Sequence, residues 1–159
     1  MAMNGALTWK PDWTAYALLW VRMAFGSHSL ISGLNNFVPI FALSGGDPSL
    51  SPIGPFMGQL IDMGLYDVVK AIEMVVGVCL LTNRFVPLAA AIELPISVVI
   101  AYLCFFVDGS PNIMFSGARE IGFNLFILAC YADTFLPIVA VKAKVRPIWR
   151  SPYLRSDGP

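Results

Sequence analysis

The chain has 159 residues, of which 57% are hydrophobic and 13% are charged, and its formal net charge is zero. Soluble domains carry about 25% charged residues, so this composition argues against a water-soluble globular domain and favours one integral membrane domain. The zero net charge gives no field that would attract nucleic acid, and a single histidine excludes bis-histidine haem ligation within the chain. We also find no metal-ligand spacing, nucleotide-binding loop or nucleophile–base set.

Four apolar segments of membrane-spanning length follow one another along the chain. We therefore expect an all-α, integral membrane four-helix bundle with spans at about residues 13–35, 65–82, 85–107 and 118–141. This transmembrane domain, residues 13–143, lies between a polar tail at 1–12 and a basic tail at 144–159. The first span is the least apolar, because an arginine such as Arg22 costs about 2.5–3.5 kcal/mol at a helix centre.

The basic residues indicate how the spans are oriented. Lys10, Arg84 and the C-terminal cluster fall on one side of the predicted membrane, whereas residues 36–64 and 108–118 contain no Lys or Arg. The positive-inside rule then places both termini in the cytoplasm and the long 36–64 loop outside. Within that loop, Pro55–Met63 is expected to form a short interfacial helix. The loop would act either as a lid over a binding site or as an interfacial cap without a ligand.

Ionisable residues occur inside three of the spans. At 1.5 Å per residue, Arg22, Glu73 and Glu93 each lie roughly 10–15 Å from the cytoplasmic face, so we expect a buried cluster of these three side chains. Gly26, Ser29 and Gly33 share a helical stripe with Arg22, which would let another helix approach closely. Such a cluster can fix helix register or carry chemistry. Because two carboxylates would share one arginine, either Lys70 reaches Glu73 or one carboxylate is protonated.

A second group of polar residues falls in the outer third of the predicted bundle. His28, Lys70, Glu120 and Asn124 are expected to form a vestibule for a quinone or a bound lipid, although a lone histidine is often a hydrogen-bonded core residue. No metal is expected there. In the basic tail, the expected contact points for a protein partner are Trp149, Arg150, Tyr153 and Arg155.

Three motifs occur in order between residues 15 and 140. They are Arg22-x-x-x-Gly26 with Gly33, Glu73-x-x-x-Gly77-x-x-Leu80-Leu81 before Asn83-Arg84, and Gly117-Ala-Arg-Glu120. Their order and spacing resemble the DoxX-like family of small four-helix membrane proteins. The chain departs from the family pattern at Arg119, where glycine is common, at Asn35-Asn36, where a lysine often stands, and in the length of the 36–64 loop.

The resemblance implies a multi-pass protein of the bacterial cytoplasmic membrane that is associated with oxidoreductases. One hypothesis is an accessory subunit that packs against and stabilises a larger respiratory, quinone-linked or photosynthetic complex, without catalysing a reaction alone. The alternative is a quinone-binding subunit of an oxidoreductase, in which Glu73 and Glu93 handle protons. A small-solute carrier is a weaker alternative, because the sequence contains no evident inverted repeat or broken helix pair.

Overall fold

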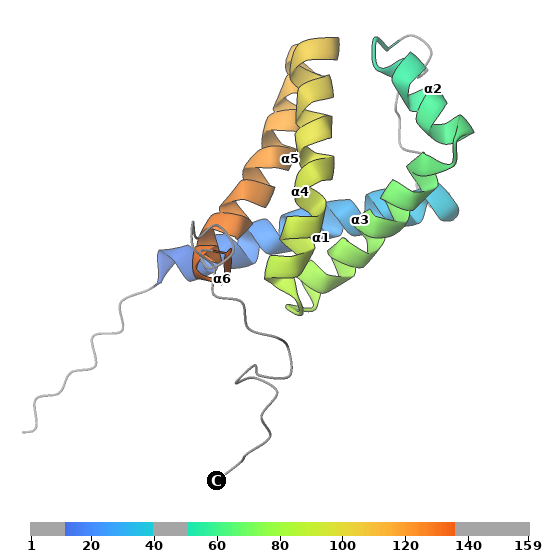
Figure 1. Cartoon of the computed structure of the whole chain (residues 1–159). Helices are drawn as coiled ribbons and strands as arrows, with labels where there is room; N and C mark the ends of the chain where they lie inside the picture. The colour runs from blue at the N-terminus through green and yellow to red at the C-terminus, as the bar shows by residue number, and fades with distance from the viewer. Residues whose placement is uncertain (1–11, 40–50, 136–159) are drawn as a thin grey trace, which may run out of the picture.

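The computed structural model describes residues 12–39 and 51–135, of which 87% are helical, with no strand among them. The all-α prediction is therefore confirmed for this part of the chain (Figure 1). The basic tail, with Trp149, Arg150, Tyr153 and Arg155, lies outside the described residues, as do residues 1–11. The elements are α1 Trp13–Phe37, α2 Gly54–Asp62, α3 Leu65–Leu81, α4 Val86–Tyr102, the π-helix η2 Leu103–Asp108, α5 Pro111–Cys130 and α6 Ala132–Phe135.

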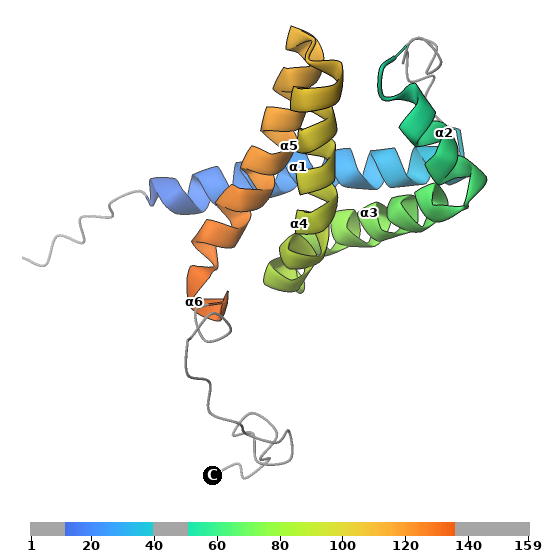
Figure 2. The same ribbon diagram turned by 45° about the horizontal axis from the view of Figure 1, so that its top comes forward.

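The long helices pack as two pairs that cross each other. Figures 1 and 2 show α1 beside α3, α4 beside α5, and the first pair running across the second. The start of α1, the α3–α4 turn and the end of α5 lie towards one side of the molecule, and α2 and the α4–α5 turn lie towards the other. The four long helices that the sequence predicts are present, but they do not run alongside one another as a single bundle of near-parallel helices.

The α1–α3 pair is held together by direct backbone contact at glycines. A Cβ atom added at Gly33 would lie 2.5 Å from the carbonyl oxygen of Lys70, and one added at Gly77 would lie 2.6 Å from the backbone nitrogen of Leu30. Real Cβ atoms do not approach backbone this closely, so neither position accommodates a larger residue without moving a helix. The helix that approaches the small-residue stripe of α1 is thus α3.

Side-chain hydrogen bonds join both ends of this pair. At the end of the pair near α2, Asn36 Nδ2 donates to Asp67 Oδ1 at 2.9 Å, and at the other end the guanidinium of Arg22 donates to the side-chain oxygen of Asn83. Asn83 and Phe85 have φ values of 57° and 54°, in the left-handed region that few non-glycine residues adopt. The α3–α4 connection is therefore a sharp turn whose first left-handed residue is bonded to α1.

The last long helix differs from its predicted limits. The predicted spans at 85–107 and 118–141 leave residues 108–117 as a loop, whereas α5 runs from Pro111 to Cys130; residues 136–141 of the predicted span lie outside the described residues. Pro111 occupies the first helical turn, where its missing N–H leaves no hydrogen bond unmade, so the Ser110-Pro111 pair is a helix start rather than a loop. The preceding helix continues to Asp108 as η2 and ends at Gly109, whose N–H donates to the carbonyl of Cys104 at 3.1 Å.

The short helix predicted at Pro55–Met63 is confirmed as α2, Gly54–Asp62. Proline lies in its first turn. Gly64, with φ of +70°, then turns the chain directly into α3. α2 packs against α3, so this part of the long loop is folded onto the helices.

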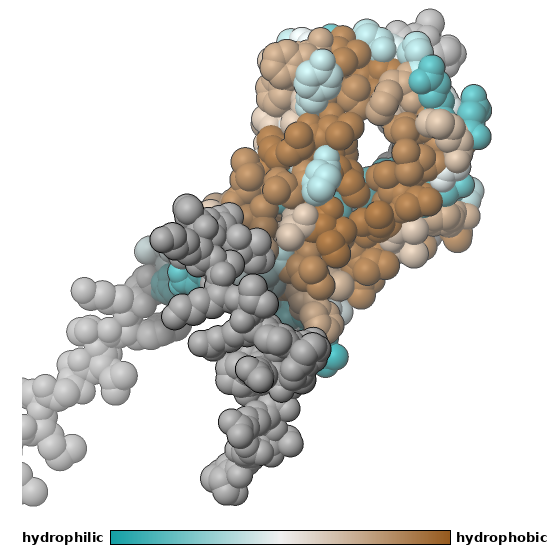
Figure 3. All heavy atoms as spheres, in the orientation of Figure 1, coloured by the Kyte–Doolittle hydropathy of each residue, from teal (hydrophilic) through white to brown (hydrophobic). Residues whose placement is uncertain are grey.

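The interior of the molecule contains polar side chains as well as a hydrophobic core, and its surface is largely apolar. Four of the seven largest fully buried side chains are polar, namely Glu93, Asn124, Ser29 and Ser97. Large hydrophobic side chains such as Phe106, Val75 and Leu125 are instead exposed, and Figure 3 shows a largely hydrophobic surface over α4 and α5. Within the described part of the chain, two helical segments, Val86–Asp108 and Pro111–Cys130, are long and apolar enough to cross a membrane. α3 has only 17 residues, the lower limit for a span, and α1 contains Arg22.

We predict that Gly33→Ala lowers the free energy of unfolding by about 1–3 kcal/mol, because its methyl group would overlap α3 backbone. The matched control is Gly122→Ala in α5, where an added Cβ meets no atom within 4 Å. That control should be neutral or more stable by up to about 1 kcal/mol, the difference in helix propensity. Chemical unfolding followed by circular dichroism measures both; equal stability of the two variants would contradict the close α1–α3 contact.

Candidate functional site

Lys70 and Glu73 form a buried ion pair on α3. Lys70 Nζ lies 2.9 and 2.8 Å from the two carboxylate oxygens of Glu73 and 2.8 Å from Ser32 Oγ on α1. Their side chains are only 12% and 6% exposed, and the Tyr66 ring centroid lies 5.2 Å from Nζ. Spacing of three residues places the two side chains on one helical face. Of the two alternatives left open by the sequence, the structure has Lys70 reaching Glu73.

Arg22 is not a member of this cluster. Within residues 12–39 and 51–135 it forms no ion pair with Glu73 or Glu93, and its guanidinium instead bonds Asn83. Side chains on a helix lean towards its N-terminus, which in α1 is the direction of the α3–α4 turn. The part of α1 that packs against α3 near Glu73 also lies about eight residues after Arg22. At 1.5 Å per residue, that is roughly 12 Å along the helix axis from Arg22. The prediction that Arg22 forms a cluster with Glu73 and Glu93 is therefore wrong. Arg22 instead joins α1 to the α3–α4 turn through its hydrogen bond with Asn83.

The acidic residue of α4, Glu93, is also buried. Glu93 has no exposed surface, and neither of its carboxylate oxygens has a hydrogen-bond partner among the described residues. Glu73 on α3 and Glu120 on α5 are close enough to Glu93 to interact with it electrostatically. We call Glu73, Glu93 and Glu120 the carboxylate cluster, because three helices each contribute one buried acidic side chain to it.

Glu120 connects the cluster to α1. His28 Nε2 lies 3.6 Å from Glu120 Oε2; the histidine side chain is 49% exposed and the glutamate side chain only 7%. One turn further along α5, Asn124 is fully buried and donates to Ser97 Oγ at 3.4 Å, while its own side-chain oxygen has no partner in the described part of the chain. A buried amide oxygen and two buried carboxylate oxygens are therefore all without a donor among these residues, which is unusual for a folded interior.

The structure does not bring the predicted vestibule residues to one opening: Lys70 and His28 line two different openings, and Glu120 and Asn124 line neither. The first, the α2–α3–α4 pocket, has a volume of about 360 Å³. Its walls are apolar apart from Lys70, Glu73 and the Tyr66 ring, and they include Phe56, Met57, Leu60, Pro95, Ile96 and Val99. Figure 3 shows an opening between α4 and α2 on this side of the molecule.

The second opening, the α1–α5 recess, has a volume of about 210 Å³ and is lined by His28 and Arg119 together with Trp20, Ala24, Phe25 and Phe123. His28 and Lys70 thus face different openings, and the carboxylate cluster lies between the helices that form them. The contribution of α2 to the first pocket was not predictable, because its apolar residues carry no signal of which helix they face.

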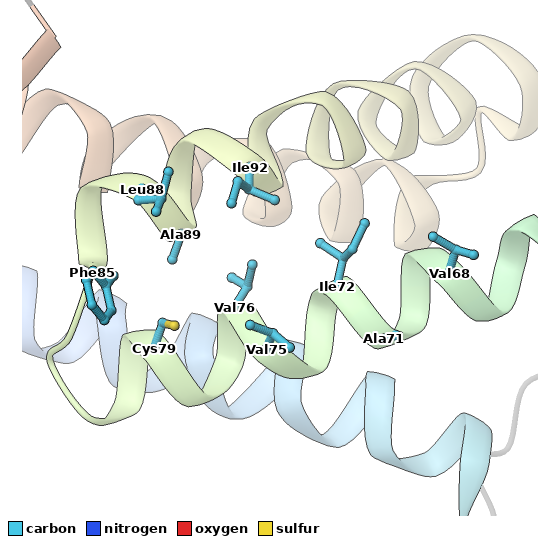
Figure 4. A pocket seen from close by; sticks show the side chains of 10 residues that line it. All are labelled: Val68, Ala71, Ile72, Val75, Val76, Cys79, Phe85, Leu88, Ala89 and Ile92. Atoms are coloured by element: carbon cyan, nitrogen blue, oxygen red, sulfur yellow. The ribbon is translucent and has the colours of Figure 1, made fainter. Parts of the chain in front are cut away.

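A larger groove, of about 450 Å³, lies between α3 and α4 where the two helices diverge from their turn. In Figure 4, Ile72, Val75 and Val76 of α3 face Leu88 and Ile92 of α4 across it. Cys79 is its most polar lining residue, so the groove offers hydrophobic contact and no acid–base group. The three cysteines of the chain, Cys79, Cys104 and Cys130, are free thiols.

No group of three His, Cys, Asp or Glu side chains within the described ranges is arranged to hold a metal ion. Comparison with protein-family models, with curated proteins and with solved structures finds no match for the chain. The resemblance to the DoxX-like family accordingly stays a prediction from the three motifs.

We predict that Lys70→Met lowers the free energy of unfolding by about 3–5 kcal/mol, because it leaves Glu73 buried without a counter-charge. The double variant Lys70→Met, Glu73→Leu removes both charges and should recover most of that loss. Chemical denaturation of the single and double variants measures the difference. A double variant that is less stable than Lys70→Met would show that Glu73 does not depend on Lys70.

Proposed function

We propose that the chain is a multi-pass membrane protein in which α1, α3, α4 and α5 all cross the bilayer. The observation that supports this is the set of buried acidic and polar side chains beneath a largely apolar surface. Charged residues inside a membrane face the interior of the protein, where they find partners, whereas the lipid-facing surface needs none. Glu73, Glu93 and Glu120 are buried, and large hydrophobic residues on all four helices are exposed.

The positions of the helix ends support the proposed topology. α1 begins, α3 turns into α4 and α5 ends towards one side of the molecule, and that side includes Arg84 in the turn. Cytoplasmic loops are enriched in basic residues, so this side is proposed to be cytoplasmic, with α2 on the outer side. Localisation to a bacterial cytoplasmic membrane rests on the DoxX-like resemblance alone.

The proposed ligand is a quinone-like amphiphile in the α2–α3–α4 pocket. Small-molecule sites are concave and mostly apolar, with a few polar groups that fix the orientation of the ligand. The α2–α3–α4 pocket has this character, because its apolar walls suit a ring and an alkyl tail while Lys70 and Glu73 supply polar groups to its lining. A ring carbonyl would accept a hydrogen bond from Lys70 in place of Ser32 Oγ, and a ring hydroxyl would donate one to Glu73.

The carboxylate cluster would exchange protons with that ligand. Glu73 lines the pocket, and Glu93 lies behind it within electrostatic range. A positioned carboxylate accepts a proton from a hydroxyl and returns it later, which is general acid–base chemistry. Electrons would pass between the quinone and a partner oxidoreductase, the class of protein implied by the resemblance.

An accessory subunit that packs against a larger redox complex is the second candidate. The observation that favours it is the α3–α4 groove, whose apolar lining would accept a helix of another membrane subunit. Its expected partner contacts Trp149 and Tyr153 belong to the tail outside the described residues. The two functions are compatible, because the groove and the α2–α3–α4 pocket have no lining residue in common.

We predict that Ile96→Trp weakens binding of a short-chain ubiquinone analogue by about tenfold or more, because the indole fills the α2–α3–α4 pocket. The control is Val98→Trp, two residues away on α4, where the side chain is outside the pocket and 51% exposed. Isothermal titration calorimetry in detergent measures both. Unchanged affinity in Ile96→Trp would contradict the assignment of the pocket. If the wild type does not bind the analogue, the quinone-binding function is wrong and the accessory-subunit function remains.

A further inference from the structure

The α1–α5 recess exists because a small residue lies between two large ones on the face of α1 that meets α5. Trp20, Ala24 and His28 are spaced four residues apart and therefore share that face. The methyl group of Ala24 leaves a space that Trp20 and His28 border one turn away on either side. On α5 the recess is closed by Arg119 and Phe123, also four residues apart, and the buried Phe25 lines it from α1.

The charge in this recess is not balanced by a direct contact. Arg119 makes no hydrogen bond or ion pair with any residue in 12–39 or 51–135, although its charge acts on His28 and on Glu120. The carboxylate of Glu120 is buried and faces His28 Nε2 at 3.6 Å. A guanidinium has five N–H donors in a planar fork, so Arg119 has donors to offer to an acceptor that enters the recess.

The walls of the recess are aromatic. The rings of Trp20 and Phe123 meet edge to face with centroids 5.6 Å apart, and Phe25 and Phe123 are 6.4 Å apart. These rings offer apolar contact to a hydrocarbon chain beside the guanidinium. The recess therefore pairs one cationic group with an apolar surface, which is the complement of an amphiphile with an anionic head.

We propose that the α1–α5 recess binds the oxyanion head of a membrane amphiphile, either the carboxylate of a fatty acid or the phosphodiester of an anionic phospholipid. Both heads present two oxygens that accept bidentate hydrogen bonds from Arg119. The first carbons of the attached chain lie against Trp20 and Phe123. An arginine within a membrane-spanning helix is costly without a directly bonded anion, and this ligand provides one. The site is separate from the α2–α3–α4 pocket and does not require that pocket to bind a quinone.

The test uses the full chain in phosphatidylcholine bilayers with spin-labelled stearate, phosphatidylglycerol or phosphatidylcholine as probes. Electron paramagnetic resonance measures the fraction of each probe that is immobilised by the protein. We expect the wild type to select stearate, phosphatidylglycerol or both over phosphatidylcholine, and Arg119→Gln to reduce that selectivity by about tenfold. Ala24→Leu, which fills the recess without changing charge, should reduce it similarly. Arg119→Lys retains the charge and should keep most of the selectivity.

The matched control is Arg84→Gln, which removes one positive charge from the exposed α3–α4 turn and should leave the selectivity unchanged. Selectivity for stearate alone identifies a fatty acid site, and selectivity for phosphatidylglycerol alone identifies a phospholipid site. The proposal is overturned if the wild type shows no selectivity, if Arg119→Gln keeps it, or if Arg84→Gln loses as much. Quinone affinity should be the same in Arg119→Gln and wild type, so failure of this proposal is distinguishable from failure of the proposed function.

Discussion

The organisation of this chain follows from the burial of ionisable groups inside an apolar exterior. Glu93 has no hydrogen-bond donor among the described residues, and Glu73 is matched by Lys70 at 2.8 Å. In water this arrangement would lower the stability of the fold in two ways, because hydrophobic side chains would be exposed to solvent and polar side chains would be buried without partners. In a bilayer the apolar surface costs nothing, and the polar groups have only one another to contact.

The crossed helix pairs explain how so many polar groups come together. Gly33 and Gly77 let α1 and α3 touch along their backbones, which places Ser32 of α1 against Lys70 of α3. α4 and α5 cross this pair and add Glu93 and Glu120 to the interior. The α2–α3–α4 pocket and the α1–α5 recess are lined by different helices, so the buried polar groups lie near two separate openings.

The sequence predicted the helical class, the short α2 helix and the close approach at the small-residue stripe, because each depends on local spacing. It did not place Arg22 correctly, because the depth of each residue was estimated from the ends of its own predicted span. That estimate ignores how far α1 is displaced along α3, and it ignores that the arginine side chain points towards the N-terminus of α1. The start of α5 was misjudged because Ser110-Pro111 was interpreted as loop. The division of the vestibule was not predictable, since periodicity gives the face of each helix but not the angle at which two pairs cross.

Oxygen and nickel accessibility of spin labels tests the membrane account most directly. The labels would be placed at Leu19, Val75, Val98 and Leu125, exposed positions on α1, α3, α4 and α5, in a cysteine-free chain reconstituted in bilayers. The account predicts that at all four positions oxygen relaxes the label more effectively than a water-soluble nickel chelate. Labels on α1 and α3 that respond mainly to the nickel chelate would contradict it and leave α4 and α5 as the only spans.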